Sequence, residues 1–264
     1  MPDAQGTISV PPYVEERIRR SAPEGCCVLP NSTPVVAFGN PGLARVATLG
    51  LNPSRIEFEV KGVELDGRAR RFETLGALGL KSLLDAPPSA IERVWWRCTN
   101  SFHGNPYSWF QRLEEMLKAV GASYFENTAC HLDLTQWATD PTWTGLGRPI
   151  RERLVAEDAE FLRAQLRTES ISLLLLNGRA VLTAFDRVLG GTLRPVSPPV
   201  TDGGTTTQLY EGNLEEVRVL GWSTNLQSSF GVTKLLRARL AERLATLARA
   251  SESASDSAGI GARP

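Results

Sequence analysis

The residues best suited to chemistry lie in two polar turns, each of which directly follows an apolar strand pattern. The first turn is residues 50–54 (GLNPS), after the apolar run 46–49. The second is residues 222–226 (WSTNL), after the run 217–220. Ligands of open α/β sheets bind at the carboxyl ends of the strands. We therefore expect the two turns to face one crevice, although they are far apart in the sequence.

Asn52 is the first candidate catalytic residue. An amide side chain at a strand end can position a water molecule or hold a substrate carbonyl without adding charge. The alternative interpretation is a plain Asn-Pro turn, which these residue types also favour.

A second group of polar residues comes from the predicted strand 124–134. Strand alternation places Asn127, His131 and Asp133 on the same face. Asp133 could be a general base with His131 as its partner. A structural hydrogen-bonded pair is the alternative for these two residues.

The second turn has the composition of a phosphate-binding loop. The side chains of Ser223, Thr224 and Asn225 could hold a phosphate, and Ser228 lies where a helix is expected to begin, which also favours phosphate. Leu226 is an apolar residue in a polar loop, and enzymes that flip bases use such side chains as wedges. A helix-capping loop with a packed leucine is the alternative.

Together the two turns resemble the signature motifs of the uracil-DNA glycosylase superfamily. The first motif of its mismatch-specific and single-strand-selective branches reads G-[IM]-N-P-G, where this chain has GLNPS. The second reads [HN]-P-S-P/G-L/R, where this chain has WSTNL. The resemblance covers about residues 45 to 250 in the order of elements. It implies that Asn52 positions water and that Asn127 recognises the base. It implies that Phe58, with Phe72 as the reserve, stacks on the base. Thr224 would contact a phosphate and Leu226 would insert into the DNA helix.

Three departures from the family pattern bear on the substrate. Trp222 replaces the histidine that stabilises the leaving base in many members, so the resemblance places Trp222 at the base. An indole N–H only donates. The rigid Pro-Ser-Pro scaffold of the second motif is missing. Ser54 replaces the bulky tyrosine that excludes substituents at the pyrimidine C5 position, and Arg55 beside it could bind a polar substituent. The pattern resembles the anti-phage branch that removes glucosylated 5-hydroxymethylcytosine.

The resemblance implies a monofunctional DNA glycosylase that flips out a modified pyrimidine and leaves an abasic site. Neither motif contains lysine, so no Schiff base or strand cleavage is expected. Two alternatives remain open: a repair glycosylase for uracil or mismatched bases, and a catalytically inactive relative that binds nucleic acid.

Strand and helix patterns alternate along the chain, which predicts an α/β fold. The same alternation predicts a three-layer α/β/α sandwich around a mostly parallel sheet of about four strands, which is also the fold that the resemblance implies. We expect residues 1–250 to form a single domain. The segment 251–264 is small and polar, and is expected to be a disordered tail.

Composition excludes several other classes of protein. The 264 residues contain 29 basic and 29 acidic side chains, which argues against a protein that coats nucleic acid along its length but allows a local basic footprint. The 4 cysteines lack metal-site spacing, so no metal or cofactor is expected. No membrane span or signal peptide is recognisable. We therefore expect a cytoplasmic monomer whose partner is DNA.

Overall fold

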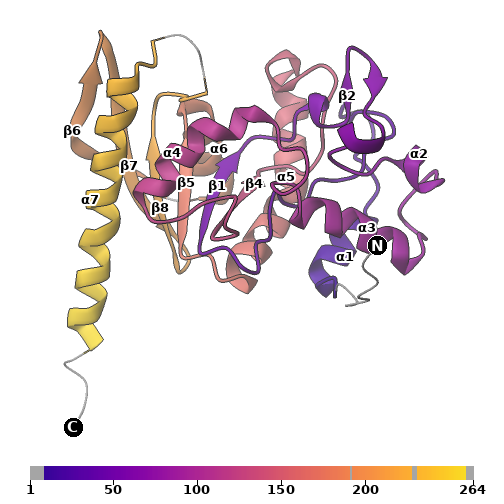
Figure 1. The fold of residues 1–264 in the computed structure, drawn as a ribbon, viewed down its shortest axis with the longest axis horizontal. Helices are drawn as coiled ribbons and strands as arrows, with labels where there is room; N and C mark the ends of the chain where they lie inside the picture. Colours follow the sequence, from indigo (N-terminus) through magenta and orange to yellow (C-terminus); the bar gives the residue numbers. More distant parts are fainter. Residues whose placement is uncertain (1–8, 191, 228–230, 260–264) are drawn as a thin grey trace.

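A six-stranded sheet runs through the centre of the molecule in the computed structural model (Figure 1). The structure describes residues 9–190, 192–227 and 231–259, without the side chains of 251–259. The strand order is β4-β1-β5-β8-β7-β6. The first four of these strands are parallel, and β7 and β6 continue the sheet antiparallel. The strands are β1 (Val46–Gly50), β4 (Ala129–Asp133), β5 (Leu173–Asn177), β6 (Arg194–Asp202), β7 (Thr205–Leu214) and β8 (Val217–Trp222), and a separate hairpin pairs β2 (Glu59–Val60) with β3 (Val63–Glu64).

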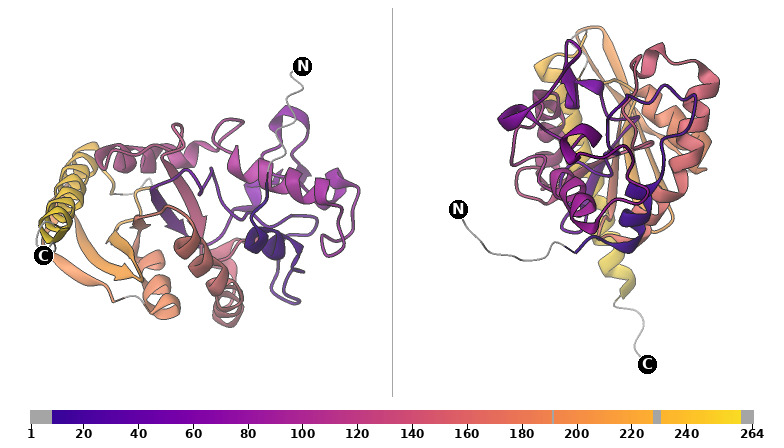
Figure 2. Two further views of the ribbon diagram at one scale, coloured as in Figure 1. Left: turned by 90° about the horizontal axis from the view of Figure 1, so that it is seen from below. Right: turned by 90° about the vertical axis from the view of Figure 1, so that its right-hand side faces the viewer.

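Helices cover both faces of this sheet, as the view from below shows (Figure 2). On one face lie α3 (Pro88–Thr99), α4 (Gln111–Ala119) and α7 (Lys234–Gly259), and on the other lie α5 (Arg148–Thr168) and α6 (Arg179–Leu189). The α/β class and the mostly parallel sheet are thus confirmed. The remaining helical segments are α1 (Pro12–Arg19), α2 (Leu75–Leu78) and the 3-10 turns η1 (Arg55–Glu57), η2 (Gly67–Ala69), η3 (Ser108–Phe110) and η4 (Trp143–Gly145).

The expected count of four strands is wrong, because β6 and β7 extend the sheet beyond β8. β6 contains Pro195, Pro198 and Pro199, a composition typical of a loop. Proline is tolerated in edge strands, whose outer N–H groups need no ladder partner. β6 is the last strand in the order, so the prolines do not prevent it from pairing with β7.

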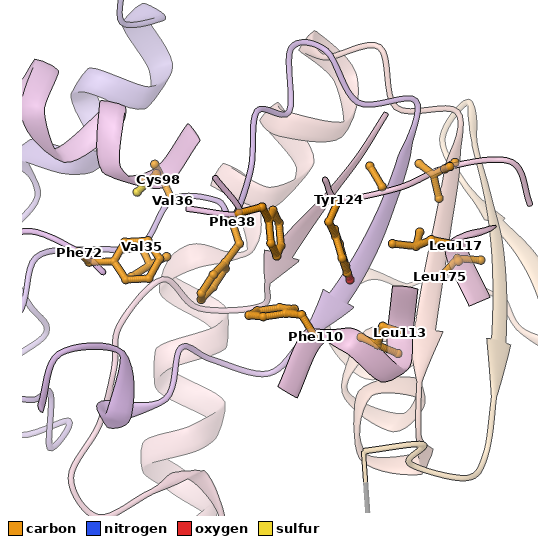
Figure 3. Close-up of a cluster of buried hydrophobic side chains, with 14 of the residues drawn as sticks. Val35, Val36, Phe38, Phe72, Cys98, Phe110, Leu113, Leu117, Tyr124 and Leu175 are labelled. Atoms are coloured by element: carbon orange, nitrogen blue, oxygen red, sulfur yellow. The ribbon is translucent and has the colours of Figure 1, made fainter. Parts of the chain in front are cut away.

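The two largest of the three hydrophobic clusters among the described residues hold the layers together. One packs α3, α4 and α7 against the sheet, and Figure 3 shows part of it around Phe38, Phe110 and Tyr124. The other packs α5 and α6 against the opposite face, with Leu162 and Phe185 fully buried. The four parallel strands are covered on both faces, which explains their continuous apolar runs.

Two predicted boundaries differ from the structure. The strand expected over 124–134 is only Ala129–Asp133, because Asn127 has a φ of 57° and turns the chain before the strand begins. The last helix reaches Gly259 instead of ending at residue 250, so the backbone of 251–259 continues it. Residues 260–264 of the predicted tail lie outside the described residues. Among the described helices, none has the length and apolar character needed to cross a bilayer.

Candidate functional site

A pocket of about 270 Å³ opens at the carboxyl ends of β1 and β4. We call it the Asn52 pocket. Polar side chains come from the turn after β1 and from β4, and aromatic side chains come from the segment that leads into α4. Its lining comprises Phe38, Asn52, Pro53, Ser54, Ile56, Glu57, Tyr107, Trp109, Phe110, His131 and Asp133.

The sheet register explains how His131 and Asp133 reach this pocket. His131 pairs with Thr48 and Asp133 pairs with Gly50 across the β1–β4 ladder. A Cβ atom on Gly50 would overlap Asp133 Oδ1 and would lie only 2.7 Å from His131 Nε2. Glycine at the end of β1 therefore leaves the space that both side chains occupy.

A chain of hydrogen bonds sets the tautomer of His131. Within the described residues, the buried Tyr124 hydroxyl has Thr48 Oγ1 as its one partner, so it donates there. Burial raises the pKa of Tyr124 well above its ordinary value, so this hydroxyl keeps its proton. Thr48 Oγ1 then donates to His131 Nδ1 at 2.7 Å. With Nδ1 as the acceptor, the ring N–H is the one at Nε2, which lies 3.4 Å from Asp133 Oδ1.

Asn52 lies where it was expected, at the carboxyl end of β1 and in the lining of the pocket. Its Nδ2 donates to the carbonyl oxygen of Trp137 at 3.2 Å and to Thr139 Oγ1 at 3.3 Å. These acceptors determine which way the amide points. No described residue hydrogen-bonds to Oδ1 of Asn52, so this oxygen remains as an acceptor at the pocket.

Glu57 is a pocket residue that the sequence analysis missed. It ends the 3-10 turn η1, is 3% exposed, and lies 3.7 Å from Arg71. Burial raises its pKa to about 7; Arg71 opposes this rise and the charge of Asp133 adds to it. Both protonation states are therefore populated near neutral pH, as general acid–base catalysis requires. A glutamate shortly after a turn is usually solvent-exposed, so nothing in its sequence context distinguished it.

Ser54 and Arg55, which precede Glu57 in the same turn, have different surroundings. Ser54 lines the pocket, and its Oγ accepts a long hydrogen bond of 3.5 Å from the N–H of Ile56. Arg55 is absent from the lining and instead forms an ion pair with Asp140 at 2.8 Å. The expectation that Arg55 contributes donors to the pocket is therefore wrong in this structure, because a nearby carboxylate holds its guanidinium.

Aromatic rings surround the imidazole of His131. The ring centroids of Phe110, Phe38 and Trp109 lie 5.1, 5.4 and 5.9 Å from it. Phe58, the expected stacking residue, is buried against Phe72 instead and does not line the pocket. The expectation for Phe58 and its reserve Phe72 is wrong, because η1 places Glu57 at the pocket and Phe58 in the core.

Asn127 is not part of this site. It precedes β4, whereas Asp133 ends the strand, so the two residues lie at opposite ends of it. Its Oδ1 accepts a hydrogen bond from His103 Nε2 at 3.0 Å, outside the pocket. The predicted base-reading role of Asn127 is therefore wrong, because this residue belongs to a turn and not to the strand.

The second turn is held inward by Asn177, another residue that the sequence analysis did not single out. Trp222 and Leu226 are both 0% exposed. Asn177 Oδ1 accepts from Trp222 Nε1 at 2.8 Å and from the Leu226 N–H at 3.1 Å. The expectations of Trp222 at the base and Leu226 as an exposed wedge are thus wrong for this structure, because both side chains belong to the core.

The polar side chains of this turn also bond within the protein. Ser223 Oγ accepts from the N–H of Gln208 at 3.0 Å, and Thr224 Oγ1 lies 2.6 Å from Thr207 Oγ1. Asn225 Oδ1 accepts from Asn177 Nδ2 at 3.1 Å. Ser228 lies outside the described residues. These contacts stabilise the turn, and they occupy the groups that were expected to hold a phosphate.

The two turns nevertheless face one crevice, as predicted. A second hollow of about 190 Å³, here called the bridging pocket, shares Asn52, His131 and Asp133 with the Asn52 pocket. Its other wall includes Asn177 and Asn225. β5 lies between β1 and β8 in the sheet, so the carboxyl ends of all three strands meet at this edge.

Comparisons with known proteins do not place the chain in a family. No protein-family model matches it, and no curated protein matches it. The described residues also contain no group of three or more His, Cys, Asp or Glu side chains that could hold a metal ion. The chemistry of the site therefore has to be inferred from its own side chains.

Those side chains are suited to activating and orienting a water molecule. Asp133 offers a carboxylate whose Oδ1 lies 3.4 Å from His131 Nε2, and Asn52 offers an uncharged acceptor oxygen. Glu57 can exchange a proton near neutral pH. A carboxylate, a carboxyl group that can donate a proton and an orienting amide in one pocket are groups that can support general acid–base chemistry.

Proposed function

We propose that the chain is a monofunctional DNA glycosylase that flips a modified pyrimidine nucleotide out of DNA and hydrolyses its N-glycosidic bond. The observation that carries this proposal is the convergence of Asn52, Glu57 and Asp133 in one pocket walled by aromatic rings. Flipped bases are commonly bound by stacking and by hydrogen bonds to their edges. The product is the free base and an abasic site in otherwise intact DNA.

In the proposed reaction, water attacks C1′ of the deoxyribose while the bond from C1′ to the base nitrogen breaks. Asn52 Oδ1 accepts a hydrogen bond from the water and orients it. The Asp133 carboxylate stabilises the cationic sugar and takes the proton that the water releases. The electron pair of the broken bond goes to the base. The base, which carries this electron pair, must then receive a proton to leave as a neutral molecule.

Glu57 is the proposed donor of that proton. A carboxyl group with a pKa of about 7 is protonated in a large share of molecules at neutral pH and loses its proton readily. Trp222 cannot serve, because its indole N–H is buried and bonded to Asn177. Glu57 thus takes the place of the histidine that the resemblance leads one to expect at position 222.

The proposed substrate is glucosylated 5-hydroxymethylcytosine in phage DNA, which would make the protein part of anti-phage defence. Ser54 supports this choice, because a small side chain in the lining leaves room beside the pyrimidine. The adjoining bridging pocket offers further space with amide groups at its edge. A lyase step is not proposed, because the described lining of the Asn52 pocket contains no lysine to form a Schiff base.

The test is excision from oligonucleotides that carry uracil, 5-hydroxymethylcytosine or its glucosylated form, followed by alkali to break the strand at abasic sites. We expect breaks with the glucosylated base alone, and a loss of about 100-fold or more in rate for Asn52→Ala and Asp133→Asn. Breaks with uracil would instead favour a repair glycosylase. Equal rates for Asn52→Ala and the wild type would contradict the mechanism.

A catalytically inactive relative that binds nucleic acid is the second candidate. The full burial of Leu226 favours it, because a wedge that stays in the core cannot fill a vacated base stack. This candidate predicts that the wild type binds DNA and produces no breaks with any of the three substrates. The same excision assay, paired with a binding measurement, separates the two functions.

A further inference from the structure

Four arginines surround a third hollow, of about 550 Å³, between the first turns of α5 and the helix α6. We call it the arginine pocket. Its lining contains Arg148, Arg151, Arg179 and Arg187 against a single acidic residue, Glu152, a net charge of +3 at neutral pH. The chain as a whole has a net charge of zero, so this is a local concentration of positive charge.

Two of the four guanidinium groups have no partner within the described residues. Glu152 Oε1 pairs with Arg148 at 2.8 Å and with Arg187 at 3.2 Å, which leaves no acidic residue of the lining for the other two. No ion pair or hydrogen bond of the Arg151 or Arg179 side chain is found among the described residues. These two cations are therefore available to an anionic ligand.

The arginine pocket is continuous with the site described above. It shares Leu51, Trp143 and Arg179 with the bridging pocket, which in turn shares Asn52 and Asp133 with the Asn52 pocket. A ligand that fills the Asn52 pocket and continues along this crevice would thus reach the arginines. Trp143, half-buried in the lining of both the bridging and arginine pockets, lies on the path between them.

We propose that the arginine pocket binds the phosphodiester backbone of the DNA strand next to the flipped nucleotide, with Trp143 stacking on a neighbouring base. Arginine binds phosphate oxygens with two parallel N–H donors, and aromatic side chains beside a basic groove are typical of proteins that bind single-stranded nucleic acid. The choice of DNA as the ligand rests on the proposed function. The arginine pocket also supplies donors for a phosphate. The second turn lacks such free donors, because the hydroxyls of Ser223 and Thr224 bond within the protein.

Binding of an unmodified, fluorescein-labelled oligo-dT of about 12 nucleotides tests this inference without requiring catalysis. Anisotropy titrations of the full chain are carried out over a range of salt concentrations. Arg151→Gln combined with Arg179→Gln removes the two free cations. We expect affinity to fall about tenfold or more at low salt, and the slope of log K against log salt to become shallower by about 1.4.

Arg163→Gln combined with Arg167→Gln is the matched control. Both residues lie on α5, pair with Glu215, and lie outside the arginine pocket, so this variant loses the same charge away from the pocket. It should bind like the wild type. Trp143→Leu should weaken binding while Trp143→Phe retains most of it, with circular dichroism to verify that each variant is folded.

Equal binding by the pocket variant and the control variant would overturn the inference, as would a wild type that does not bind the oligonucleotide. Its failure can be told apart from failure of the proposed function. Excision with unchanged binding by the pocket variant refutes the arginine pocket alone. Binding through the arginines without excision of any base refutes the glycosylase alone and leaves a DNA-binding protein.

Discussion

The carboxylate of Asp133 occupies the space beside Gly50 that any larger side chain at position 50 would fill. The two residues are direct partners in the parallel ladder between β1 and β4. Gly50 therefore has a role that cannot be seen in its own turn. It allows a charged residue from another strand to reach the pocket that Asn52 lines.

Gly50→Ala tests this relationship. The added methyl group must displace Asp133 or His131, and we expect a loss of about 1–3 kcal/mol in the free energy of unfolding, as for other overpacked sites. Urea unfolding followed by circular dichroism measures it. Gly104→Ala is the control, because the nearest atom to its added Cβ is 4.0 Å away. If both variants were equally stable, the space beside Gly50 would not be restricted.

Glu57→Gln should change how stability depends on pH. The pKa of Glu57 is raised in the folded protein to about 7 from an ordinary value of 4.5, mainly by burial. Below pH 4.5, Glu57 is protonated in both the folded and the unfolded protein, so its raised pKa does not reduce the stability of the fold. As pH rises towards 7 the unfolded chain releases the proton first, so the wild type loses on the order of 3 kcal/mol of stability that Glu57→Gln retains.

Urea unfolding of both proteins at pH about 5 and about 8 measures this difference. Glu126→Gln controls for the loss of one exposed negative charge. A gap between Glu57→Gln and the wild type that stays constant with pH would show that Glu57 does not titrate in this range. In the excision assay, Glu57→Gln should also remove the fall in rate above pH 7 that a donor acid causes.

Thr48→Val should disrupt the hydrogen bonds that set the His131 tautomer. The substitution leaves the buried Tyr124 hydroxyl without an acceptor and His131 Nδ1 without a donor. We expect a loss of about 1–3 kcal/mol, together with a change in the ring ¹⁵N shifts of His131. Thr48→Ser keeps the hydroxyl and should keep the Nε2-protonated spectrum. An unchanged spectrum in Thr48→Val would contradict the proposed hydrogen-bond chain.

Leu226→Ala shows whether Leu226 acts as a core residue or as a wedge in DNA. Because Leu226 is fully buried, its truncation should cost about 2–5 kcal/mol of stability, the range for large-to-small substitutions in a core. A wedge exposed in the free protein would instead lose DNA affinity with little change in stability. Thermal or urea unfolding without DNA, compared with the oligo-dT titration, shows which effect dominates.

Several elements were predictable from local sequence because their signals are local. β1, β5 and β8 are covered on both sides and therefore read as short apolar runs, and Asn52 follows one of them directly. β6 was not predictable in this way, because its prolines are acceptable only at a sheet edge. Asn127 was misplaced for a related reason, since a turn before a strand differs little in composition from the strand itself.

The sequence by itself determined the alternation of strands and helices, the strand-end position of Asn52, and the shared face of His131 and Asp133, since each follows from residues close together in the chain. Only the tertiary structure decided that Glu57 is buried beside Asp133, that Asn177 holds Trp222 and Leu226 in the core, and that Arg151 and Arg179 face one hollow. Burial, pKa and charge density depend on which distant segments pack together. That packing is set by the whole sheet, and no single motif contains it.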